Sequence, residues 1–289
     1  MKPEKKSVVI ISAILVIAVT ATLVLIPLIS RNSGNRYMRE DLRNVDNVTL
    51  ISHCIEINGV KNSVAGFKEC VRLGAKGVIV DLCFKKDGTP VISDSYSTAD
   101  SAETVEDLFK AMSDGKYKEI SVYFNIIQLS DLSRLNSLAV SYNILDRVFL
   151  IGIDSEHYDL INTDDTIIPF LLDYNFKDSD LDALKKGSFT RPDILDKYGA
   201  TGLVLPSSQI SEELVEALND YGILYIVNVA DESSDMCQTL LKGADNVIVP
   251  DIEKASRTMN EWTLEMQKRY KESVDKSIKA LSEKENGNK

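Results

Sequence analysis

Short runs of β-branched and other apolar residues alternate with helix-like stretches through most of this chain, and this alternation constrains the fold more than any other feature. Such a pattern is typical of parallel strands joined by crossover helices. About eight strand–helix units occur in roughly 210 residues, so we expect a closed (β/α)8 barrel of the TIM type in preference to an open sheet. The predicted strands are 48–52, 77–84, 120–127, 147–151, 167–172, 202–205, 224–229 and 246–249, with a further short strand at 90–92.

The N-terminal residues predict a membrane anchor in front of this barrel. Residues 7–29 contain no charged side chain, and about 20 apolar residues suffice to span a bilayer as a helix. A cleaved signal peptide would have a shorter apolar run that ends in a small-residue cleavage site. We therefore expect one uncleaved, single-pass transmembrane helix. Basic residues on the two sides of this helix are nearly balanced, so they do not decide its orientation in the membrane. The short N-terminal tail before the helix favours an orientation in which the rest of the chain is extracytoplasmic.

The charge of the chain is unevenly distributed. The net charge is −11, and residues 46–289 hold 26 Lys and Arg against 41 Asp and Glu. An acidic body argues against a nucleic-acid partner, because phosphates require a basic surface. The predicted organisation is a tail and anchor at 1–29, a linker at 30–47, the barrel at 48–255 and an amphipathic, charged helix at 256–289. We expect the start of that helix to contact the barrel, and a membrane-surface or partner-helix role for the rest stays open.

Histidines and cysteines are few. The histidines are His53, at the end of the first predicted strand, and His157, in a segment with no partner pattern. The cysteines are Cys54, Cys70, Cys83 and Cys237. They form no Cys-x-x-Cys pair and have no histidine at a zinc spacing, so we expect mostly buried thiols. A disulfide between Cys54 and Cys83, which follow or end adjacent predicted strands, is an open alternative.

Three motifs follow one another in the first part of the predicted barrel. Their sequences are Ser-His-Cys at 52–54 followed by Lys-Asn-Ser at 61–63, Gly-Ala-Lys-Gly-Val-Ile-Val-Asp-Leu at 74–82, and Lys-Asp-Gly-Thr-Pro-Val-Ile-Ser-Asp at 86–94. In order and spacing they resemble the glycerophosphodiester phosphodiesterase family, and a looser match extends the resemblance to about residues 46–255. The resemblance implies the β/α barrel of that family and a phosphoric diester hydrolase of lipid metabolism.

The same resemblance implies that the acid/base and phosphate-binding positions are largely substituted. Members of the family use two histidines as acid and base and an arginine on the phosphate. His53 stands at the first histidine, Cys54 at the arginine and Asp94 at the second histidine. Loss of one acid/base partner alone removes a factor of about 10²–10⁴ in rate.

The metal-binding positions are also substituted. The family holds a divalent cation with carboxylates, and here Asp81 keeps one of them while Ile79 replaces another. A further glutamate of the family falls at Ile126 or Ile127. Ca²⁺ and Mg²⁺ need several oxygen ligands, so Asp81 alone would bind either ion weakly.

We therefore expect a catalytically impaired pseudoenzyme, without a cofactor, that binds a glycerophosphodiester, a lipid headgroup or another polar ligand, or a protein partner. Asn62, Lys61 and Lys86 are the candidate ligand-binding residues. The alternative is a divergent but active hydrolase, in which Asp94 acts as base and Glu56 joins Asp81 in holding Ca²⁺ or Mg²⁺.

Overall fold

The structure is a computed structural model, and it describes residues 48–287 except 129, 155–157, 159–165 and 186–194. The chain divides into two units, and residues 47–260 make up the unit that holds the strands. The predicted anchor at 7–29 and His157 lie outside the described residues. No helix within the described ranges combines the length and apolar character needed to cross a bilayer.

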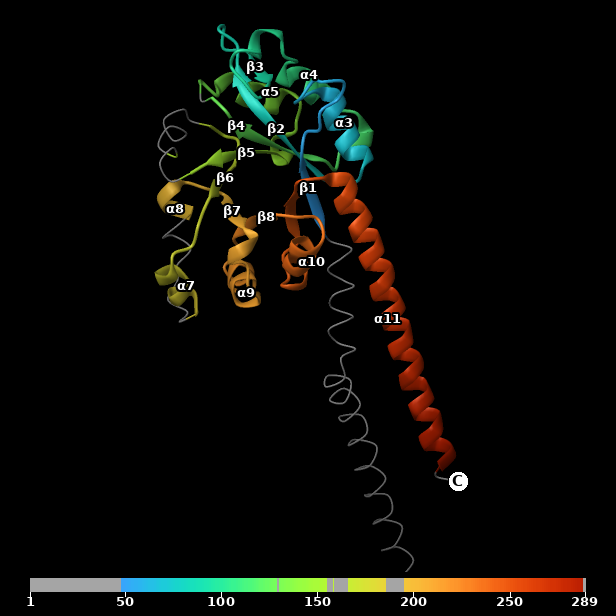
Figure 1. Cartoon of the computed structure of the whole chain (residues 1–289). Coiled ribbons are helices and arrows are strands. Elements are labelled where there is room, and N and C mark those ends of the chain that lie inside the picture. The colour runs from blue at the N-terminus through green and yellow to red at the C-terminus, as the bar shows by residue number, and fades with distance from the viewer. Residues whose placement is uncertain (1–47, 129, 155–157, 159–165, 186–194, 288–289) are drawn as a thin grey trace, which may run out of the picture. The chain divides into compact units, whose positions relative to one another are not determined.

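Eight parallel strands form a closed barrel, as the alternation predicted. β1 pairs with β2 on one side and with β9, the last strand, on the other, and these pairings close the ring. The barrel strands are β1 (Thr49–His53), β2 (Gly77–Phe84), β4 (Ser121–Ile126), β5 (Val148–Ile153), β6 (Phe170–Asp173), β7 (Gly202–Pro206), β8 (Leu224–Asn228) and β9 (Asn246–Val249) (Figure 1). The predicted short strand is β3 (Pro90–Ile92), which lies antiparallel to β2.

Helices follow the strands, and local sequence sets where several of them begin. The described helices are α3 (Val64–Arg72), α4 (Val105–Met112), α5 (Ser133–Ser141), α7 (Asp178–Lys185), α8 (Leu195–Tyr198), α9 (Glu212–Asp220), α10 (Ser234–Leu241) and α11 (Ile252–Gly287). Ser63 caps α3, because its Oγ accepts the Gly66 N–H at 3.0 Å. Thr104 caps α4, and Thr104 and Asp107 each accept a backbone N–H from the other.

The interior of the barrel is apolar in its middle and polar at one end. One buried cluster joins Ile51, Ile79, Tyr123, Ile151, Leu171, Ile226 and Ile248. Side chains of a strand alternate between its faces, so the residue two positions after an inward-facing one points inward again, nearer the C-terminal end of the strand. By this rule five polar residues, which we call the mouth layer, lie above the apolar cluster: His53, Asp81, Asn125, Asp173 and Asn228. In β/α barrels this is the end at which functional sites are found.

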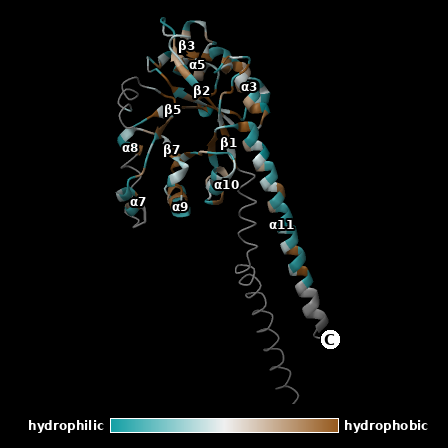
Figure 2. Ribbon diagram, in the orientation of Figure 1, coloured by the Kyte–Doolittle hydropathy of each residue, from teal (hydrophilic) through white to brown (hydrophobic). Residues whose placement is uncertain are grey.

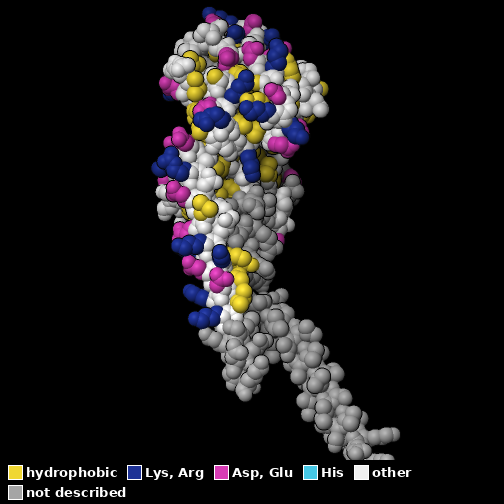
Figure 3. Space-filling view, turned by 90° about the vertical axis from the view of Figure 1, so that its right-hand side faces the viewer, with side chains coloured by type: hydrophobic (Ala, Val, Ile, Leu, Met, Phe, Trp, Pro, Cys, Tyr) yellow, Lys and Arg dark blue, Asp and Glu magenta, His cyan; other side chains and the backbone are white. Residues whose placement is uncertain are grey.

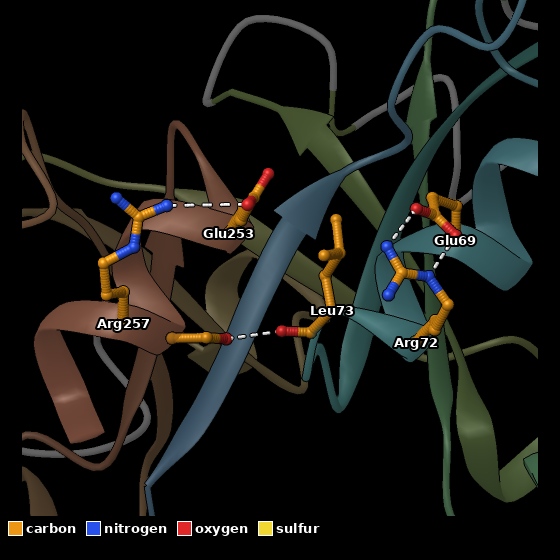
Figure 4. A network of polar contacts seen from close by, with 6 residues as sticks. Glu69, Arg72, Leu73, Glu253 and Arg257 are labelled. Carbon is orange, nitrogen blue, oxygen red and sulfur yellow. Dashed lines mark hydrogen bonds and ion pairs between the residues drawn. The ribbon is translucent and has the colours of Figure 1, made fainter.

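The start of α11 packs on the barrel unit, as predicted. Ile252 and Ala255 are buried, and Ser256 Oγ donates a hydrogen bond to the Leu73 carbonyl at the C-cap of α3, at 2.6 Å (Figure 4). The helix begins at Ile252, and its residues up to 260 group with the barrel. Figure 2 shows that most of the described length of α11 is hydrophilic, in agreement with the predicted charged character.

Candidate functional site

His53 ends β1 and belongs to the mouth layer. Its side chain reaches solvent, yet partial desolvation lowers its pKa, against an opposing effect of the Asp81 charge. The imidazole is therefore neutral at pH 7 and able to accept a proton. The next residue, Cys54, is a poor nucleophile, because burial raises the pKa of its thiol to about 12.

All four cysteines are free thiols, so the alternative of a disulfide between Cys54 and Cys83 is not realised in this structure. Cys54 Sγ donates to the Ser63 carbonyl at 3.4 Å. Cys83 is fully buried in a separate cluster with Val91 and Ala99.

Asp81, in the middle of β2, is held by two asparagine side chains. Asn62 Nδ2 donates to Asp81 Oδ2 at 2.9 Å, and Asn125 Nδ2 donates to Oδ1 at 2.7 Å. The Asp81 backbone N–H in turn donates to Asn62 Oδ1 at 3.0 Å. Asn62, predicted as a ligand-binding residue, thus uses both ends of its amide on Asp81. The carboxylate braces the loop before α3 against β2 and β4.

A β-bulge in β5 shapes the next part of the mouth. The four residues of β5 from Leu150 to Ile153 lie opposite the three residues of β6 from Phe170 to Leu172, so β5 has one extra residue. Gly152 inside the bulge has φ +75°. A Cβ atom on Gly152 would overlap Asn125 Oδ1, so the close approach of the two strands here requires glycine. An extra residue reverses the alternation of a strand. The bulge therefore buries Ile153 and brings Asp154 beside Asp173 of β6.

The carboxylates of Asp154 and Asp173 are near enough for one charge to affect the other, which the sequence did not predict. Partial desolvation, followed by the negative charge of Asp154, raises the pKa of Asp173 to about 6. The available signal was weak: Asp173 stands two residues after an apolar strand residue, and many exposed aspartates do the same. Only the register of β5 against β6 shows that both carboxylates lie at the same end of neighbouring strands.

Replacement of Asp173 by asparagine is expected to stabilise the fold at pH 7.5 and to leave its stability unchanged at pH 3. A raised pKa in the folded state means that stability is lost as the pH rises from about 4 to 6, because the folded carboxylate ionises with difficulty. Because the side chain reaches solvent, we expect a gain of only about 1 kcal/mol. Urea unfolding at the two pH values measures it. Asp182→Asn removes an exposed aspartate of α7 beyond its first turn and is the matched control, so it should change stability at neither pH. A gain that is equal at both pH values in Asp173→Asn would contradict the assignment.

A cavity of about 500 Å³ lies next to the mouth layer, and we call it the side cavity. Its walls come from the loop after β1 and from the segment between β3 and α4, and Asn62 is the residue it shares with the Asp81 brace. Charged and polar lining residues include Glu56, Lys61, Ser93, Asp94 and Glu103. Lys86, the remaining predicted ligand-binding residue, is exposed in the turn between β2 and β3 and does not line the side cavity.

The residues at the mouth do not fit the divalent cation that the motif resemblance implies. Ile79, at the position of a metal carboxylate, is 1% exposed inside the apolar cluster. From β4 the neutral Asn125 faces Asp81, and the placement of the family's further glutamate at Ile126 or Ile127 stays a prediction. Over the described ranges, no three His, Cys, Asp or Glu side chains are grouped so that they could hold a metal ion. The carboxylates of the described residues thus do not form the grouped ligand set that Ca²⁺ or Mg²⁺ requires.

Comparison with known proteins gives structural relatives only. No protein-family model and no curated protein sequence matches the chain. A putative glycerophosphoryl diester phosphodiesterase from Silicibacter pomeroyi matches with a TM-score of 0.57 and 12% identity, over 74% of this chain and 94% of that one. A putative glycerophosphodiester phosphodiesterase from Galdieria sulphuraria matches with a TM-score of 0.56 and 14% identity, over 75% of this chain and 97% of that one. A glycerophosphodiester phosphodiesterase from Agrobacterium tumefaciens matches with a TM-score of 0.55 and 12% identity, over 73% of this chain and 99% of that one. The family that the motifs resemble is therefore confirmed at the level of the fold: this chain has the β/α barrel of the glycerophosphodiester phosphodiesterases.

Proposed function

We propose that this chain is a membrane-anchored barrel of the glycerophosphodiester phosphodiesterase type that binds a phosphodiester or another small polar ligand at its mouth without hydrolysing it. The observation that carries the proposal is the brace around Asp81, in which each carboxylate oxygen accepts an amide N–H from Asn62 or Asn125. This arrangement uses Asp81 as a structural acceptor. It leaves the charge on a bound phosphoryl group without a cationic partner.

The chemistry of phosphoryl transfer explains why that matters. Most of its catalysis is electrostatic stabilisation of the phosphoryl oxygens by cations and hydrogen-bond donors. None of the five mouth-layer residues is Arg or Lys, and two of them are aspartates. His53 is a single neutral base, and Asp94, at the position of the second histidine, faces the side cavity. These features support binding over hydrolysis.

The cellular setting belongs to the same proposal. Residues 7–29 would anchor the chain in a membrane as a single pass, with the barrel on the extracytoplasmic side. The acidic composition of residues 46–289 supports a partner other than nucleic acid. On the face shown in Figure 3, Lys and Arg side chains are interspersed with Asp and Glu among the described residues, which offers a polyanion no uniformly basic surface there.

A direct assay tests the loss of hydrolysis. The full-length chain in detergent is incubated with glycerophosphocholine and glycerophosphoethanolamine, with and without Ca²⁺, Mg²⁺ or Mn²⁺, and released glycerol 3-phosphate is measured. We expect no release above the buffer level from protein that shows a cooperative thermal unfolding transition. Metal-dependent release that both His53→Ala and Asp81→Asn abolish would refute the proposal and favour the active hydrolase.

A further inference from the structure

The side cavity has the dimensions of a small-molecule site. Pockets for small ligands typically enclose about 300–1,000 Å³, and this one encloses about 500 Å³. Its lining is mixed, with the apolar Val60, Ile92 and Ala102 beside the hydroxyl groups of Ser93 and Thr98. A ligand with a short carbon skeleton and several polar groups matches such a lining.

The charges of the side cavity are predominantly negative. Three carboxylates line it, against the single ammonium of Lys61. Glu103 is already engaged, since its Oε2 accepts the Val64 N–H at the start of α3 at 2.6 Å. Glu56 and Asp94 are both exposed, and within the described residues neither side chain has a hydrogen bond or an ion pair. Two carboxylates thus stay available to a ligand.

The carboxylates of the neighbouring mouth add to the negative electrostatic potential in the side cavity. Asn62 separates the side cavity from Asp81, whose carboxylate accepts its amide at 2.9 Å. Asp154 and Asp173 lie at the same end of the barrel. Opposite charges attract and like charges repel over several ångströms, so a cation is favoured here over a phosphate. A metal ion lacks the grouped ligands that it needs in the described part of the chain, whereas an ammonium group needs only two or three acceptors.

We propose that the side cavity binds a small organic cation with hydroxyl groups, whose ammonium group lies against Glu56 and Asp94. This inference goes beyond the proposed function, because the side cavity lies next to the mouth layer and has a lining of its own. The carboxylates bind the charged end. The hydroxyls of Ser93 and Thr98 bond each other at 2.7 Å and both reach the Ser95 carbonyl, so they serve the hydroxyl groups of the ligand as acceptors only. Lys61, at the same cavity, lowers the affinity for the cation.

Three compounds that share a three-carbon skeleton test the inference. The full-length chain in detergent is titrated with 1,3-diaminopropan-2-ol, glycerol and glycerol 3-phosphate, and binding is measured by calorimetry and by saturation-transfer NMR. We expect the diamine to bind best and its affinity to fall as the salt concentration rises. Asp94→Asn and Glu56→Gln should each weaken it about fivefold, as loss of one exposed charge pair does. Lys61→Gln should tighten it or leave it unchanged.

A control and three contrary outcomes complete the test. Asp178→Asn removes an exposed carboxylate that does not line the side cavity and should leave the affinity unchanged. Preferred binding of glycerol 3-phosphate, lost in Lys61→Gln, would overturn the cation and leave the proposed function standing. Diamine binding that Asp94→Asn and Glu56→Gln do not weaken would overturn the site, as would binding of none of the three compounds. The hydrolysis assay reports on the proposed function separately.

Discussion

Gly152→Ala is expected to lower the free energy of unfolding by about 3 kcal/mol, a large effect for the addition of one methyl group. Two causes add. The φ of +75° costs a residue with a Cβ about 1–2 kcal/mol. The new Cβ also displaces Asn125 Oδ1, which breaks the hydrogen bond from Asn125 to Asp81 and removes about 1.5–3 kcal/mol for a bond to a charged group. Urea unfolding of the full-length chain in detergent measures the change.

Gly88 provides the matched control for this substitution. It has φ +77° in the turn between β2 and β3, and a Cβ there would meet no atom within 4 Å. Gly88→Ala therefore carries the backbone cost alone, about 1–2 kcal/mol. Equal losses in the two variants would show that the contact between Gly152 and Asn125 contributes nothing.

Asp81→Ala is expected to destabilise the barrel by about 3 kcal/mol through loss of two hydrogen bonds to a charged acceptor. It leaves the amide of the 7%-exposed Asn62 without an acceptor and loosens the loop that Asn62 holds to β2. Asp81→Asn should lose less, because one amide oxygen still serves one of the two donors. Urea unfolding at pH 7 measures both variants.

Asp94→Asn is the control for this series, since Asp94 is exposed and unpaired within the described residues, and we expect a change under about 0.5 kcal/mol. A loss that is equally small in Asp81→Ala would contradict the brace. It would return Asp81 to the list of candidate metal ligands.

The fold was predictable because its signals are local. The run at 77–84, which is apolar except for Asp81, predicted a strand buried on both faces, and β2 has these bounds with every residue buried except Asp81. The Asp87-Gly88 turn predicted a short returning strand, which is β3. Thr104, with Asp107 three residues later, marked the start of α4. Such signals depend on neighbours within a few residues of the chain.

The mouth was harder to predict because it depends on register. His53 and Asp81 were found through motifs, whereas the contact of Asn125 with Asp81 was not predicted. Which residue of β4 meets Asp81 follows from strand pairing across 44 positions of sequence. The proximity of Asp154 to Asp173 depends in turn on one extra residue in β5, whose only sign in the sequence is a glycine between two isoleucines.

Closure of the barrel between its first and last strands has a consequence for synthesis of the chain. Thr49 of β1 pairs with Asn246 of β9, so one edge of β1 has no partner until almost all of the barrel has left the ribosome. At about 5–20 residues per second, that interval lasts on the order of 10–40 s. Contacts of such large sequence separation also make folding slow. During this time the free edge of β1 is open to wrong pairing, so the yield of native protein should depend on chaperones and on temperature more than its final stability does.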